Sequence, residues 1–130
     1  MAALALLFAV AQPAELRITH AGPEDRPVAR IIVHTAGHPP PAAACRAAHC
    51  FEAAAPAWTK IAAAAAAAID ADEPPGPKRL GTFVFELRGH GKSERRLSAG
   101  QSAELLGQLA RVVEGTELAR ELDRRSALGR

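Results

Sequence analysis

The sequence predicts an α+β domain: an antiparallel sheet of four to five strands with two main helices packed on one face and a short C-terminal helix. Two observations support this class. Short stretches of alternating or β-branched apolar residues precede each of two longer segments with helical apolar spacing, which gives the order ββ(β)αββα. In addition, a sheet that exposes one face to water needs apolar helix faces to cover the other.

The size and composition of the chain favour a single domain. It has 130 residues, of which 48% are hydrophobic and only 4% aromatic, so an alanine-rich core of modest area is expected. Sixteen basic and fourteen acidic residues give a net charge of +2, too small to draw the whole protein onto nucleic acid or an anionic membrane. Nucleic acid is therefore not an expected partner.

The N-terminal segment is typical of a secretory leader. Residues 2–11 carry no charge, and Ala9-Val10-Ala11 fits the small-x-small pattern of a cleavage site. We interpret residues 1–11 as a signal peptide, although the basic n-region is missing and the true start could lie further upstream. The alternative is an N-terminal core helix or strand, because ten apolar residues are too few to span a bilayer, and no membrane span is expected elsewhere. The domain then covers residues 12–123, followed by a frayed tail at 124–130, in a periplasmic or secreted protein.

The first half of the domain contains the strand signals. Residues Glu15–His20 alternate between apolar and polar side chains, and Val28–Thr35 is β-branched and apolar, so these two stretches predict an antiparallel hairpin. Pro39–Pro41 ends the second strand, because proline has no N–H to donate to a ladder. A third, short strand is expected over Arg46–Glu52.

A helix and a second hairpin follow. Pro56 is suited to the first turn of a helix that continues at helical apolar spacing to about Asp70, where a proline-rich loop begins. Thr82–Arg88 has phenylalanine and leucine on one face and predicts the clearest strand. After a glycine-rich turn, Ser93–Leu97 returns as an edge strand.

Two further helices complete the chain. Ser98 and Gln101 form a capping-box pattern ahead of an apolar stripe that runs to Val113. Gly115 is placed to end that helix, and Thr116 to cap the last short one.

The two longer helical segments can be aligned without gaps. The alignment of residues 54–69 with 98–113 pairs four apolar or small positions of one helix with four of the other. We interpret this as an internal duplication of a strand-strand-helix unit, although alanine-rich helices also align by chance. The paired positions are Trp58 with Ser102, Ile61 with Leu105, Ala65 with Leu109, and Ile69 with Val113.

Histidine and cysteine concentrate in one segment: His34, His38, Cys45, His49 and Cys50. In an exported protein, a disulfide between Cys45 and Cys50 is the simplest interpretation and uses both thiols. The alternative is a zinc or copper site built from all five side chains, since imidazole and thiolate are the preferred ligands of these metals. The spacing includes no Cys-x-x-Cys and is not diagnostic. No cofactor is otherwise expected.

Basic residues gather around the second hairpin. Arg88, His90, Lys92, Arg95 and Arg96 form a candidate binding patch for an anionic glycan, an acidic partner surface or, less expected, nucleic acid. The alternative is an edge strand whose charges discourage pairing with another chain.

No catalytic signature is present. The serines lack a nucleophile-elbow context, and nothing in the sequence places His20 or His90 beside a serine or carboxylate. We therefore expect a non-enzymatic, exported binding or inhibitor-like module whose partner is another protein or an envelope component. The alternatives from other classes are a metal-binding or metal-trafficking protein and a divergent hydrolase.

Overall fold

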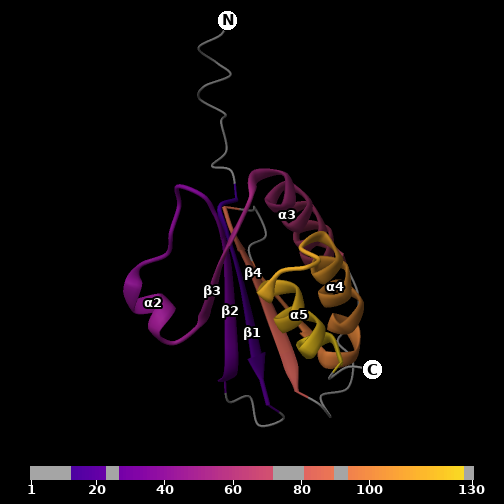
Figure 1. The fold of residues 1–130 in the computed structure, drawn as a ribbon. Helices are drawn as coiled ribbons and strands as arrows, with labels where there is room; N and C mark the ends of the chain where they lie inside the picture. The colour runs from indigo at the N-terminus through magenta and orange to yellow at the C-terminus, as the bar shows by residue number, and fades with distance from the viewer. Residues whose placement is uncertain (1–12, 23–26, 72–80, 90–93, 128–130) are drawn as a thin grey trace, which may run out of the picture.

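The computed structural model describes residues 13–22, 27–71, 81–89 and 94–127 (Figure 1). It has the predicted α+β class, with a five-stranded sheet and the longer helices on one side of it. The elements follow one another in the order β1 (Glu15–Ala21), β2 (Pro27–Thr35), α2 (Ala42–Arg46), β3 (His49–Ala53), α3 (Ala55–Asp70), β4 (Thr82–Arg88), β5 (Glu94–Ser98), α4 (Ala99–Val112) and α5 (Glu117–Ala127).

The strands lie in the order β3-β2-β1-β4-β5. Strand β1 pairs antiparallel with both β2 and β4, and β4 pairs antiparallel with β5, which confirms the two predicted hairpins. Strand β3, however, pairs parallel with β2, so the sheet is mixed, and the prediction of a purely antiparallel sheet is wrong at this edge. Parallel neighbours require a crossover connection, and residues 36–48 supply it.

The crossover contains a short helix that the sequence analysis did not predict. Helix α2 includes Arg46, which was expected to begin the third strand, and β3 starts only at His49. With five residues, mostly alanine, and none of them buried, α2 has no apolar periodicity to detect. Figure 1 shows α2 on the opposite side of the sheet from the other helices.

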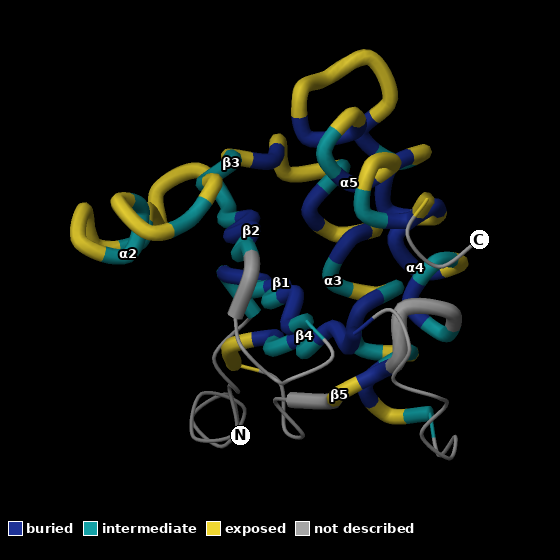
Figure 2. Tube along the Cα trace, turned by 90° about the horizontal axis from the view of Figure 1, so that it is seen from below, coloured by how far each residue is buried: buried dark blue, intermediate teal, exposed yellow. Residues whose placement is uncertain are grey.

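The core lies between one face of the sheet and helices α3, α4 and α5 (Figures 1 and 2). Alternate strand residues, such as Leu16 and Ile18 in β1, point into this layer and are almost completely buried. In addition, the indole Nε1 of Trp58 in α3 donates a hydrogen bond to the carbonyl of Pro13 at 2.9 Å, which ties the start of the described chain to the helix layer. None of the helices in the described ranges is long and apolar enough to cross a bilayer.

The two halves of the chain have matching positions in this layout. Strands β1 and β4 are adjacent at the centre, and each has its hairpin partner, β2 or β5, on the outside. All eight residues that the sequence alignment pairs between the two helices are buried. This arrangement is consistent with a duplicated strand-strand-helix unit to which α2 and β3 have been added.

The last helix is longer than the sequence predicted. Thr116 Oγ1 accepts a hydrogen bond from the Ala119 N–H at 3.2 Å, as expected of a capping residue. The helix then runs to Ala127, so residues 124–127 are helical and do not form the frayed tail expected from Arg124 onward. The reason is that Ser126 is fully buried and its Oγ donates to the Ala103 carbonyl in α4 at 2.7 Å.

Candidate functional site

The face of the sheet opposite the helices α3, α4 and α5 carries mostly charged and hydroxyl side chains. We call it the open face. Its residues follow from the strand register, because side chains of a strand alternate between the two faces and those of paired residues lie on the same face. The described residues of the open face are Glu15, Arg17, Thr19, Arg30, Ile32, His34, Cys50, Glu52, Thr82, Val84, Glu86, Arg88 and Arg96.

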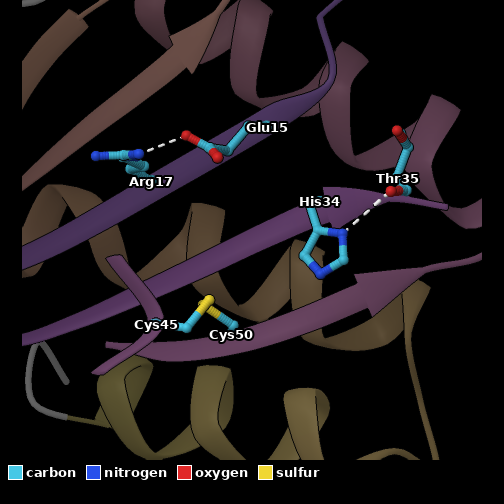
Figure 3. Close-up of a disulfide and its surroundings, with 6 residues drawn as sticks. All are labelled: Glu15, Arg17, His34, Thr35, Cys45 and Cys50. Carbon is cyan, nitrogen blue, oxygen red and sulfur yellow. Dashed lines mark hydrogen bonds and ion pairs between the residues drawn. A yellow bond between two sulfur atoms is a disulfide. The ribbon is translucent and has the colours of Figure 1, made fainter. Parts of the chain in front are cut away.

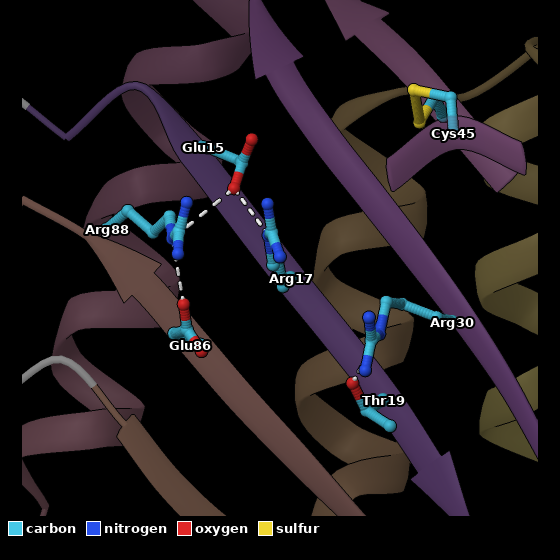
Figure 4. A network of polar contacts seen from close by, with 8 residues as sticks. Glu15, Arg17, Thr19, Arg30, Cys45, Glu86 and Arg88 are labelled. Atoms are coloured by element: carbon cyan, nitrogen blue, oxygen red, sulfur yellow. Dashed lines mark hydrogen bonds and ion pairs between the residues drawn. A yellow bond between two sulfur atoms is a disulfide. The ribbon is translucent and has the colours of Figure 1, made fainter. Parts of the chain in front are cut away.

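An ion-pair network joins β1 and β4 on the open face, at the end of the sheet where β1 begins and β4 ends (Figure 4). Arg17 Nε donates to Glu15 Oε2 at 2.6 Å. From the neighbouring strand, Arg88 Nε lies 3.6 Å from the same oxygen and donates to Glu86 Oε1 at 2.9 Å. The Glu15 side chain is only 10% exposed, whereas that of Arg88 is 55% exposed. Arg88 is thus the accessible end of a network whose acidic centre is covered.

Two more arginines bridge neighbouring strands through threonine hydroxyls. Arg30 Nε in β2 donates to Thr19 Oγ1 in β1 at 3.2 Å, as Figure 4 also shows. Arg96 Nη1 in β5 donates to Thr82 Oγ1 in β4 at 3.4 Å. These contacts hold planar guanidinium groups across the strands, and such groups can recognise carboxylates or aromatic rings of a partner.

The sequence analysis missed most of this network. The predicted alternation assigns Glu15, Arg17 and Thr19 only to the polar side of the first strand, and Arg30 has no assigned role in the predicted second strand. Alternation in β1 does place Glu15 and Arg17 opposite the core residues Leu16 and Ile18. The pairing of β1 with β4, which brings Arg88 beside Glu15, joins residues far apart in the chain and had no local signal.

A disulfide joins α2 to β3 at the edge of the open face (Figure 3). The Cα atoms of Cys45 and Cys50 are 5.7 Å apart, and the pair is consistent with the predicted bond. It fixes the end of the crossover to the edge strand. Cys50 pairs in register with Ile32, which is fully buried although it lies on the open face. A disulfide is compatible with an oxidising compartment.

The five proposed metal ligands do not come together. Both cysteines are in the disulfide, and His34 Nδ1 lies 3.0 Å from the Thr35 carbonyl (Figure 3). His49 pairs with the core residue Ile31, so it lies on the helix side of the sheet, while His34 lies on the open face. Over the described part of the chain, no three His, Cys, Asp or Glu side chains are grouped to hold a metal ion. His38 lies apart in an exposed turn.

The predicted basic patch is only partly described. Arg88 and Arg96 share the open face and are exposed, but Arg88 is bound to Glu15 and Glu86, so its charge is largely compensated. The backbone of Arg95 pairs with that of Phe85. His90 and Lys92 lie outside the described residues. Arg88 and Arg96 therefore belong to a mixed-charge surface.

Two serines and one histidine that were considered as catalytic candidates are buried in the described structure. Ser102 and Ser126 are fully buried, and Ser126 is bound to the Ala103 carbonyl, so neither hydroxyl can meet a substrate. His20 is mostly buried and stacks on Phe83, with 4.5 Å between ring centroids. These three residues have packing roles.

Comparisons with protein-family models, with curated proteins and with solved structures found no match to this chain.

Proposed function

We propose that this chain is an exported, non-enzymatic module of the periplasm or the extracellular space that binds another protein or an envelope component. The binding surface is the open face of the sheet, centred on Arg88 and Arg96. The observation that carries the proposal is the asymmetry of the sheet. One face is filled by three helices, while the other presents arginines held in place by neighbouring acids and hydroxyls.

The anchoring of these arginines supports a protein or an envelope component as the partner. The guanidinium groups are anchored before binding, so little side-chain entropy is lost when a partner carboxylate meets them. Arginine is enriched at the centres of protein interfaces. The disulfide and the uncharged segment at residues 2–11 support the assignment to an oxidising, exported location.

The test compares capture of a partner from the envelope and secreted fractions by immobilised wild-type protein and by the double variant Arg88→Gln/Arg96→Gln. We expect the variant to lose at least about tenfold in affinity, because two exposed guanidinium groups are removed. Lys60→Gln is the matched control, since Lys60 is an exposed cation on α3, on the other side of the sheet. Equal loss in the control variant, or no loss in the double variant, would refute the open face as the binding surface.

A further inference from the structure

The free edge of the sheet at β3 lies beside α5. Strand β3 is the first in the strand order and pairs only with β2 among the described strands, so one row of its backbone groups has no strand partner. Its residues His49 and Phe51 and one face of α5 enclose a groove of about 300 Å³. Figure 2 shows α5 beside β3 at the same end of the sheet. The helix residues lining the groove are Glu117, Arg120, Glu121 and Arg124.

The charges along this face of α5 alternate in sign. The four lining residues are spaced i, i+3, i+4 and i+7, so they form one stripe along the helix. Read from the N-terminus, the stripe is negative, positive, negative, positive. When such a stripe meets its own copy in the antiparallel direction, centred between Arg120 and Glu121, every acid faces a base. Glu117 then meets Arg124 of the second copy at the outer ends of the stripe. Glu121, whose side chain is only 13% exposed, keeps its contact of 2.8 Å with Arg124 of its own helix.

A two-fold axis perpendicular to the sheet produces this arrangement together with strand pairing. Such an axis at the β3 edge makes β3 antiparallel to its copy, and it makes two helices of the same layer antiparallel as well. A pairing centred on Phe51 uses all five residues of β3 and places the two Phe51 rings opposite each other. Aromatic pairs across antiparallel strands are favourable.

We propose that β3 and α5 form a self-complementary surface through which two copies of this chain dimerise, giving one continuous ten-stranded sheet. The occupant of the groove is the second copy: the Phe51 rings of the two protomers meet where the two grooves join, beneath the charged stripes. The dimer does not depend on the proposed function, because the β3 edge and the open face around Arg88 are different surfaces. Evidence against dimerisation would therefore not count against partner binding at the open face, and the reverse also holds.

The test is a charge-reversal exchange at the outer pair of the stripe. Glu117 is exposed and the Arg124 side chain is 66% exposed, so Glu117→Arg and Arg124→Glu should both fold. Each variant alone places like charges opposite each other at two contacts of its homodimer. The dissociation constant of that homodimer should therefore be at least about tenfold higher than that of the wild type. An equimolar mixture of the two variants restores opposite charges at both contacts and should recover dimers, all of them heterodimers.

Sedimentation equilibrium over a range of concentrations measures the dimer, and hydrogen exchange of the β3 amides reports whether the strand edge is paired. Asp123→Arg is the control, because Asp123 is exposed on α5 but does not line this groove. A wild-type protein that stays monomeric, variants that dimerise like the wild type, or a mixture that fails to recover dimers would overturn the proposal. Binding of an unrelated extended peptide at β3 with no self-association would overturn it as well.

Discussion

Gly81, which directly precedes β4, shows how a single residue secures the centre of the sheet. Its φ of +89° lies in the left-handed region, and a Cβ built on it would overlap the carbonyl oxygen of Ala21 at the end of β1. Both the backbone conformation and the close approach of the neighbouring strand therefore require glycine.

Substitution of Gly81 tests this packing. Gly81→Ala should lower the free energy of unfolding by at least about 2 kcal/mol, because strain at positive φ adds to a clash with rigid backbone. Denaturant unfolding measures the change. Gly115→Ala is the matched control, because the φ of Gly115 is +86° but a Cβ there meets open space. It should lower the free energy of unfolding by about 1 kcal/mol. Equal losses of unfolding free energy in the two variants would show that the close approach of the Ala21 carbonyl to position 81 adds nothing to the strain.

Ser126 offers a second test at the residue scale. Its hydroxyl is buried and donates to the Ala103 carbonyl, so it fastens α5 to α4. Ser126→Ala should lower the free energy of unfolding by about 1 kcal/mol, the usual value of one buried hydrogen bond. A variant as stable as the wild type in thermal unfolding would show that apolar packing alone holds α5.

At the scale of elements, the sequence predicted most strands and helices but not every neighbour. Residues 15–20 and 82–88 were predicted as strands from their alternation, and the structure places β1 and β4 there within one residue. Strand β3 was expected, yet its parallel pairing was not, because pairing direction depends on the path of the crossover. The site shows the same difference between local and long-range contacts. Cys45 and Cys50 are close in the sequence, which suggested their bond, whereas Glu15 and Arg88 are far apart in the sequence and meet only in the folded sheet.

The disulfide should stabilise one end of the molecule without being needed for the fold. Cys45 and Cys50 are five positions apart and neither belongs to the buried core. The chain-entropy relation gives about 2 kcal/mol for so short a loop, so Cys45→Ala/Cys50→Ala should lose about that much in denaturant unfolding.

The reducing-agent control separates the bond from the side chains. Reduction of the wild type should reproduce the loss of the double variant, and the double variant itself should not respond to the reductant. Unfolding of the whole sheet on reduction would contradict the view that α2 and β3 are an addition to a self-sufficient core.

At the scale of the whole molecule, the two faces of the sheet should differ sharply in their tolerance of substitution. Leu87 and Val84 lie in the same strand, but Leu87 is fully buried under the helices and Val84 is on the open face. Leu87→Ala should lower the free energy of unfolding by about 2–5 kcal/mol, because apolar burial is lost and a cavity remains. Val84→Ala should lower the free energy of unfolding by about 1 kcal/mol or less, because Val84 is only partly buried. Similar losses in thermal unfolding would mean that both faces are packed.

The central claim is that the open face meets a partner protein or envelope component, while the exposed side of α3 does not. Photo-crosslinking in cells tests it most directly, with a photoreactive amino acid placed either at Thr19 on the open face or at the exposed Ala63 on α3. The account predicts a discrete covalent adduct with one exported or envelope component from position 19 and none from position 63. An adduct from position 63 alone, or none from position 19, would contradict it.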